Sequence, residues 1–153
     1  FALLPHLMER AGSNSKGTIT AFFTVLVDGD DLSDPIADQS RSILDGHIVL
    51  TRKLTEEGFY PPIDLLQSAS RVIDKVISKE QYNRFLKLKR ILSLIKENEV
   101  LLRVGAYKKG MDKELDSALY KKDKIKAFLT QGTGELYSYD SIVKTLMEVT
   151  NDW

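Results

Sequence analysis

An arginine ends the segment of this chain that is best suited to chemistry, the run from Asp64 to Arg71. Tyr60-Pro61-Pro62 stands just before this run, and the prolines force the chain there into an extended path. We expect Ile63–Leu66 to form a short strand, so that Arg71 lies at a rigid corner just past it. An arginine suits such a corner because its guanidinium is always charged and presents a planar fork of donors to phosphate oxygens.

Both Arg71 and Tyr60 also have purely structural interpretations. Spacing alone favours a surface ion pair of Arg71 with Asp64 or Asp74. Tyr60 has a fixed direction because Pro61 restricts its backbone, and the residue types alone favour packing in the core or at its rim. The choice between these interpretations needs information from the rest of the chain.

The sequence contains no loop of the kind that holds nucleotide phosphates. The pattern G-x-x-x-x-G-K followed by Ser or Thr does not occur, and the glycine patches at residues 12–17 and 132–134 lack the required lysine spacing. No apolar strand ends in an acidic residue that would hold magnesium. The chain has no cysteine and only 2 histidines, so we predict no metal-ligating residues in it.

The length and amino-acid composition of the chain are typical of a globular protein. At 153 residues the chain can bury one core, or a small core with an appended helical unit. Equal numbers of basic and acidic residues, 22 each, argue against a dedicated nucleic-acid binder. The longest apolar run, residues 21–27, is far shorter than the ~20 residues of a membrane span, and the first residues do not resemble a signal peptide. We therefore expect a cytoplasmic protein.

The first half of the chain reads as mixed α/β structure. Residues 18–27 are rich in β-branched and aromatic types and predict a central strand of a parallel sheet. Asp34 and Pro35 predict the start of a helix that runs to about residue 44. A second short strand is expected over residues 47–51, followed by a helical turn over residues 52–57.

The second half, from about residue 76, reads as helical. Ser78 with Gln81 predicts a capped helix start, and an apolar stripe persists from there to Gly105. Two shorter helices are expected over residues 112–120 and 123–130, and a last helix begins with a cap at Ser138.

Three segments, Val27–Pro35, Ser42–Leu50 and Asp64–Arg71, together and in this order resemble the C-terminal third of the rotary-type secretion ATPases. This family comprises the flagellum-specific ATPase and the ATPases of type III secretion, relatives of the F-type and V-type subunits. The resemblance covers almost the whole chain. In that family the phosphate loop and the magnesium ligands lie upstream of these segments. The chain is thus expected to be a C-terminal piece that cannot hydrolyse ATP alone.

The resemblance implies a fold and three site residues. Residues 1–75 would be the C-terminal portion of a RecA-like α/β nucleotide-binding core, and residues 76–153 an all-α C-terminal domain. Arg71 would act catalytically as an arginine finger in the nucleotide site of the neighbouring subunit. Tyr60 would stack on the adenine held by its own subunit, and Tyr107 could form the other side of that pocket. ATP and Mg²⁺ would be bound mainly by the upstream part of the parent, the full-length ATPase of which this chain would be the C-terminal piece.

The resemblance also implies a function and partners. The parent would be a ring, a hexamer, that couples ATP hydrolysis to the export of flagellar or virulence proteins at the membrane export gate. Its partners would be a stator-like regulator, a central coiled-coil stalk protein, and export chaperones with their cargo. The alternatives are a catalytic or regulatory subunit of a rotary ATP synthase, and a non-enzymatic helical adaptor that binds through residues 78–104.

Two charged groups have open interpretations. Asp28, Asp30, Asp31 and Asp34 lack the calcium-loop spacing, so a solvated turn that caps the next helix and a contact with a stalk subunit remain as the two alternatives. A second group, formed by Arg84, Lys87 and Arg90, recurs along one helical stripe. Such a stripe is usually a solvated face, and the alternative is a docking surface for an acidic partner helix.

Overall fold

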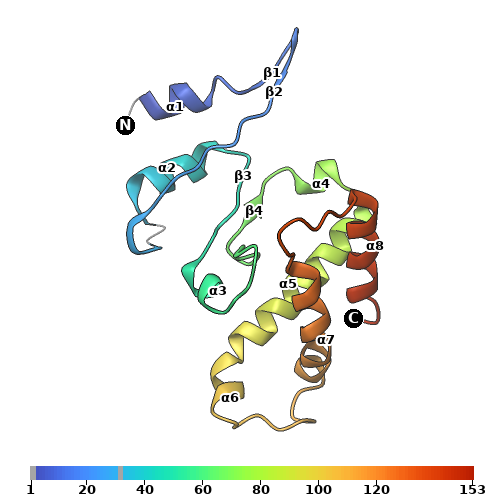
Figure 1. The fold of residues 1–153 in the computed structure, drawn as a ribbon. Helices are drawn as coiled ribbons and strands as arrows, with labels where there is room; N and C mark the ends of the chain where they lie inside the picture. The colour runs from blue at the N-terminus through green and yellow to red at the C-terminus, as the bar shows by residue number, and fades with distance from the viewer. Residues whose placement is uncertain (1–2, 31–32) are drawn as a thin grey trace. The chain divides into compact units, whose positions relative to one another are not determined.

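The computed structural model describes residues 3–30 and 33–153, and divides the chain into two compact units, Phe1–His47 and Ile48–Trp153. The first unit contains, in chain order, α1 (Leu3–Met8), β1 (Gly12–Asn14), β2 (Gly17–Ile19), the 3-10 helix η1 (Asp28–Asp30), α2 (Pro35–Ile43) and β3 (Gly46–His47) (Figure 1). The second contains α3 (Arg52–Glu56), β4 (Ala69–Ser70), α4 (Ile73–Val76), α5 (Lys79–Glu97), α6 (Glu99–Arg103), α7 (Lys113–Leu129) and α8 (Tyr139–Val149). The predicted division near residue 75 follows sequence character rather than packing, and it stays a prediction.

In the first unit, α2 begins as predicted and a short hairpin precedes it. The Asp34 carboxylate accepts hydrogen bonds from the backbone N–H groups of Ile36 at 2.9 Å and Ala37 at 3.1 Å, which satisfies the open helix start. Strands β1 and β2 pair antiparallel, with Gly12 opposite Ile19. Helices α1 and α2 lie against each other and bury Met8, Ala37 and Ser40.

The predicted strand over residues 18–27 is wrong for most of its length. Strand β2 ends at Ile19, and no described residue pairs with residues 20–27. Phe22 and Leu26 are each 91% exposed. A β-branched and aromatic run forms a strand only where another backbone pairs with it, and no described residue pairs with this run, although Phe23, Val25 and Val27 are partly buried.

The short strands predicted around residue 50 form only in part. Of the strand predicted over residues 47–51, His47 lies in β3 and Leu50 meets Ile63 in an isolated antiparallel bridge. Residues 65–67 form a turn instead of the predicted strand end. The strand that precedes Arg71 is β4, at Ala69–Ser70, with Ser70 its last residue. The predicted helical turn is confirmed as α3, which Gly58 follows with a φ of 69°.

The second unit is helical from α5 onward, as the sequence predicts from about residue 76, and the short helix α4 before it was not predicted. The hydroxyl of Ser78 accepts the N–H of Gln81 at 3.1 Å and so caps α5, and the hydroxyl of Ser138 caps α8 in the same way. The apolar stripe reaches Gly105, yet α5 ends at Glu97. Asn98 breaks the helix because its side-chain amide donates to the carbonyl of Leu94, at 2.9 Å, in competition with the backbone.

The two helices predicted over residues 112–130 are one helix, α7. Lys121 and Lys122, which lie between the predicted helices, are good helix formers, so nothing in the sequence stops the helix there. Leu115, Ala118 and Ile125 lie on one face of α7 and are buried. Ala118 and Ile125 pack with residues of α5 and α8 in a common core that includes Leu88, Ile91, Leu94, Leu146 and Val149.

Candidate functional site

Tyr60 lies exposed at the end of a tightly held turn. Helix α3 begins at a Thr51 cap, and Gly58 reverses the chain after it, where the N–H of Phe59 donates to the carbonyl of Leu54 at 2.8 Å. The side chain of Tyr60 that follows is 51% exposed. A half-exposed aromatic ring on a fixed backbone can present one of its faces to a flat ligand.

A loop that sequence reasoning did not assign lies beside Tyr60. The backbone N–H of Gln131 donates to the carbonyl of Tyr60 at 2.8 Å, so the loop between α7 and α8 begins next to the tyrosine. This loop turns tightly, with the N–H of Gly132 bonded to Glu135 at 2.8 Å, and it exposes 94% of Leu136. The glycines at 132 and 134 were its only sequence signal.

Asp64 organises the turn that precedes Arg71. Its carboxylate accepts the backbone N–H groups of Leu66 at 2.9 Å and Gln67 at 3.0 Å, and the Gln67 side-chain amide at 2.7 Å. Lys96 of α5 lies 3.5 Å from the same carboxylate. Burial raises the pKa of Asp64, but the hydrogen bonds from Gln67 and Leu66 together with the Lys96 charge outweigh it, so this pKa lies below its usual range.

Arg71 follows β4 directly and is exposed. It therefore presents a permanent positive charge at the surface, three residues beyond the Asp64 turn. Such a guanidinium can bind a phosphate or carboxylate of another molecule, or of another copy of this chain, through two parallel hydrogen bonds.

Tyr107 is not brought together with Tyr60. Its hydroxyl donates to Asp116 at 2.8 Å and contacts the carbonyl of Asp112 at 3.0 Å, at the first turn of α7. Tyr60 lies beside Gln131, just beyond the other end of this helix, whose 17 residues span about 25 Å at 1.5 Å per residue. Partial burial and the hydrogen bond to the Asp116 carboxylate raise the pKa of Tyr107.

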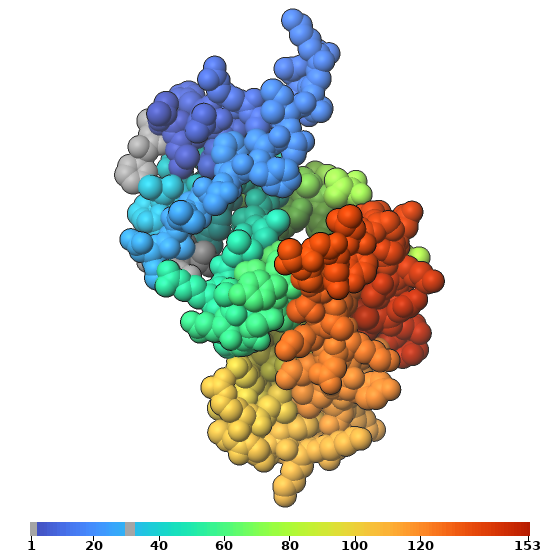
Figure 2. All heavy atoms as spheres, in the orientation of Figure 1, coloured from blue at the N-terminus to red at the C-terminus, as the bar shows by residue number. Residues whose placement is uncertain are grey.

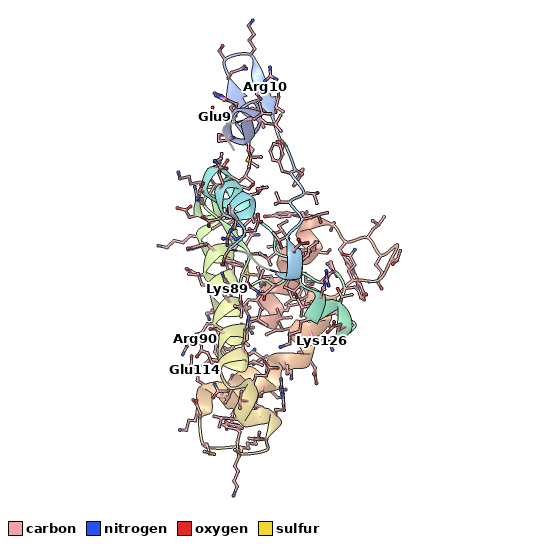
Figure 3. All side chains as sticks on the ribbon, turned by 90° about the vertical axis from the view of Figure 1, so that its left-hand side faces the viewer. Glu9, Arg10, Lys89, Arg90, Glu114 and Lys126 are labelled. Atoms are coloured by element: carbon pink, nitrogen blue, oxygen red, sulfur yellow. The ribbon has the colours of Figure 1, made fainter. Side chains whose placement is uncertain are left out.

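The stripe formed by Arg84, Lys87 and Arg90 is used inside the second unit. Arg84 donates to the carbonyl of Thr150 at 3.1 Å, and Lys87 to the carbonyl of Trp153, so both hold the residues that follow α8. Arg90 of α5 points toward Glu114 of α7 and forms a two-bonded ion pair at 3.0 and 3.1 Å (Figure 3). These contacts favour a structural role for the stripe over the docking alternative.

No metal centre is built from the described residues. Among residues 3–30 and 33–153 no group of three His, Cys, Asp or Glu side chains is placed to hold a metal ion. In the predicted aspartate cluster, Asp34 caps α2, and Asp31 lies outside the described residues. Nor does any described helix have both the length and the apolarity that crossing a membrane requires.

Comparison with known proteins matches both parts of the chain. Residues 1–70 match the model of the ATP synthase alpha/beta family, nucleotide-binding domain, and residues 77–148 match that of the T3SS EscN ATPase C-terminal domain. A flagellum-specific ATP synthase of Helicobacter pylori strain 26695 is 56% identical over 149 residues, which are 97% of this chain and 34% of the relative. The chain thus spans about a third of that relative's length.

Two solved structures are similar to this chain over almost its whole length. The assembled ATPase EscN of the type III secretion system of enteropathogenic E. coli aligns with a TM-score of 0.93 at 44% identity, over 97% of this chain and 36% of EscN. EscN in complex with its central stalk EscO aligns with a TM-score of 0.87 at 43% identity, over 98% of this chain and 35% of that chain. An α/β nucleotide-binding portion followed by a helical domain is therefore the fold class of this chain, as predicted.

Proposed function

Because the chain belongs to the family of flagellum-specific and type III secretion ATPases, we propose that it is the C-terminal third of a ring-forming ATP hydrolase that energises the export of flagellar or virulence proteins. One observation carries this proposal: the likeness, with a TM-score of 0.93, to an assembled secretion ATPase over 97% of the chain. The chain by itself should not hydrolyse ATP, because it has no phosphate-binding loop.

In this proposal Arg71 is the catalytic residue and acts on the nucleotide of the neighbouring subunit. A positive charge supplied in trans stabilises the charge that develops on the transferred phosphoryl group, an effect of roughly 10³–10⁵ in rate in related NTPases. The exposure of Arg71 beyond a rigid turn supports this role.

Tyr60 binds the adenine of the nucleotide in its own subunit. Its half-exposed ring and the neighbouring loop after α7 are suited to a flat base, since aromatic rings stack well in an offset arrangement. Tyr107 as a second adenine contact remains a prediction, and its distance from Tyr60 along α7 makes the loop at residues 131–137 the better candidate for the opposite side of the base.

ATP is expected to bind with Mg²⁺. The described residues offer an aromatic ring and a guanidinium but no cluster of carboxylates for the ion, so they fit the adenine end and the far side of the phosphates rather than the metal. The Mg²⁺ ligands and the phosphate loop would belong to other parts of the ring.

The partners follow from the same proposal. The chain would assemble in a hexamer and receive a central coiled-coil stalk protein. The similar structure of assembled EscN in complex with its central stalk EscO supports an oligomer with a stalk partner. A stator-like regulator and export chaperones with their cargo would bind the ring, in the cytoplasm and peripherally at the membrane export gate. No nucleic-acid partner is expected, since the formal net charge is zero.

Mixed rings test the action of Arg71 across a subunit boundary. Full-length Arg71→Ala subunits would be mixed with full-length subunits disabled in the phosphate loop, and ATP hydrolysis would be measured after ring formation is confirmed. Some interfaces then join an intact loop to an intact Arg71, so we expect partial activity that neither variant shows alone. Mixed rings that form but stay inactive would return Arg71 to a structural ion pair with Asp64 or Asp74.

A further inference from the structure

A dense set of hydrogen bonds holds the turn at Asp64–Ser68. Besides the carboxylate bonds of Asp64, its carbonyl accepts the N–H of Ser68 at 3.0 Å and the Ser68 hydroxyl at 2.7 Å. The Asp64 side chain is only 15% exposed, although it is charged. A partly buried carboxylate with this many donors holds the local backbone in one conformation.

Val49, from an earlier segment of the chain, forms hydrogen bonds with both ends of the turn. The N–H of Asp64 donates to the carbonyl of Val49 at 2.9 Å, and the N–H of Val49 donates to the Ser68 hydroxyl at 3.0 Å. Both backbone groups of Val49, which is itself buried, are thus bonded to the two ends of the turn. The turn cannot shift without breaking bonds at both ends.

Helix α5 sets the place of this turn. Lys96 reaches the Asp64 carboxylate from α5, and Leu65, the next residue of the turn, packs against the core formed by α5, α7 and α8. The ion pair joins residues 32 apart in sequence. The turn is therefore attached to the helical core by one polar and one apolar contact.

Arg71 is three residues beyond Ser68, so its Cα lies within about 11 Å of the turn at most. We propose that Asp64 is a positioning residue for Arg71. Its ion pair with Lys96 fixes the position of the turn relative to α5, so that the guanidinium of Arg71 reaches the neighbouring subunit at the correct place. This inference rests on the proposed catalytic role of Arg71. It assigns to Asp64 and Lys96 a part in ATP hydrolysis without contact to the nucleotide.

The expected effect is on turnover rather than on nucleotide binding. In the full-length ATPase, Asp64→Ala removes every carboxylate bond of the turn and should lower kcat by about 10- to 100-fold, since a misplacement of ~1 Å can cost about that much. The KM for ATP should change little, because Tyr60 and the phosphate loop of the same subunit still bind it.

Asp112 provides the matched control. Its carboxylate accepts two backbone N–H groups at the start of α7, Glu114 at 2.8 Å and Leu115 at 3.1 Å, in the same geometry as Asp64. Asp112→Ala should lower Tm about as much as Asp64→Ala, but it should leave kcat unchanged. An equal loss of kcat in both variants would reduce Asp64 to a general stabilising role and overturn the inference.

Two milder variants separate the turn from the ion pair. Asp64→Asn keeps an oxygen for the two backbone N–H groups but loses the charge, and Lys96→Gln loses the same ion pair from the other side. Each should lower kcat by about two- to fivefold, the size expected for a half-exposed ion pair, and the double variant should be no worse than either. Multiplying losses in the double variant would show that the two residues do not act together.

A double-mutant cycle with Arg71→Ala distinguishes this inference from the proposed function. If Asp64 acts through Arg71, Asp64→Ala should cost no further residual activity in the Arg71→Ala background. The same fold loss in both backgrounds would overturn the role of Asp64 while the role of Arg71 stands. Full activity of Arg71→Ala itself would overturn the proposed function, and the inference with it.

Discussion

The helical core and the Tyr60–Arg71 segment use their charged and aromatic residues in opposite ways. In the core, formed by α5, α7 and α8, basic side chains bind carbonyls and a carboxylate of the same unit. In the segment, a network of hydrogen bonds holds the backbone, while Tyr60 and Arg71 at its two ends stay exposed. Side chains bonded in the core contribute to stability, and an exposed ring or guanidinium on a fixed backbone can also contact a ligand or another subunit.

Burial in the second unit follows the same contrast. Helices α7 and α8 lie directly against each other (Figure 2), and Ile91 of α5 and Leu115 and Ile125 of α7 are at most 1% exposed. Substitutions in the two regions should therefore separate cleanly, with changes in the core lowering stability and changes in the segment lowering activity. Four predictions test this separation.

The largest effect is expected at Arg71. Arg71→Ala in the full-length ATPase should lower kcat by about 10³-fold or more, and Arg71→Lys nearly as much, because lysine keeps the charge but loses the planar fork. Tm and nucleotide affinity should stay close to those of the parent. Steady-state hydrolysis and equilibrium nucleotide binding measure the two quantities, and an active Arg71→Lys protein would argue for a simple charge effect.

The core should respond in the reverse way. Ile91→Ala removes a fully buried side chain of α5 and should lower the free energy of unfolding by about 2–5 kcal/mol, measured by chemical denaturation. Leu86→Ala lies on the same helix but is 46% exposed, and its cost should be less than about 1 kcal/mol. Similar losses in the two variants would contradict the placement of the core.

Tyr60 should affect binding more than turnover. Tyr60→Ala should weaken nucleotide affinity by about 1–3 kcal/mol, as the loss of a stacked base does, so that KM rises while kcat changes less. Tyr60→Phe keeps the ring and is the control. Tyr107→Ala, measured beside it, should leave KM unchanged if Tyr107 only anchors the start of α7, and a raised KM would support its predicted place in the adenine pocket.

The smallest effect is expected at the pair Arg90–Glu114. Both side chains are about half exposed, at 52% and 48%, and solvent screens such pairs. A double-mutant cycle with Arg90→Ala and Glu114→Gln should give a coupling free energy of at most about 1 kcal/mol, weaker at high salt. A coupling that high salt leaves intact would indicate a pair more shielded than its exposure suggests.

The features predicted correctly from the sequence alone are those that depend on interactions between residues close together in the chain. The caps at Asp34, Ser78 and Ser138 were predicted correctly because each joins a side chain to a backbone N–H two or three residues away. The helical second half follows from the period of its apolar residues. The family, and the assignment of roles to Tyr60 and Arg71 as proposals, came from motifs that are continuous in sequence.

Predictions failed where a secondary-structure element depends on its contacts with other segments of the chain. The strand expected over residues 18–27 has the right residue types, but a strand exists only when another backbone pairs with it. The strand end expected at Leu66 is a turn instead, since the Asp64 carboxylate holds the backbone of Leu66 and Gln67.

Only the tertiary structure decided which residues of the site meet. The bond from Gln131 to Tyr60, the pair of Lys96 with Asp64, and the bond from Arg84 to Thr150 join residues between 32 and 71 positions apart. It also placed Tyr107 at the opposite end of α7 from Tyr60. The physical reason is that a local hydrogen bond is fixed by spacing along the chain, whereas a long-range contact is fixed by the path that packing of the whole core imposes.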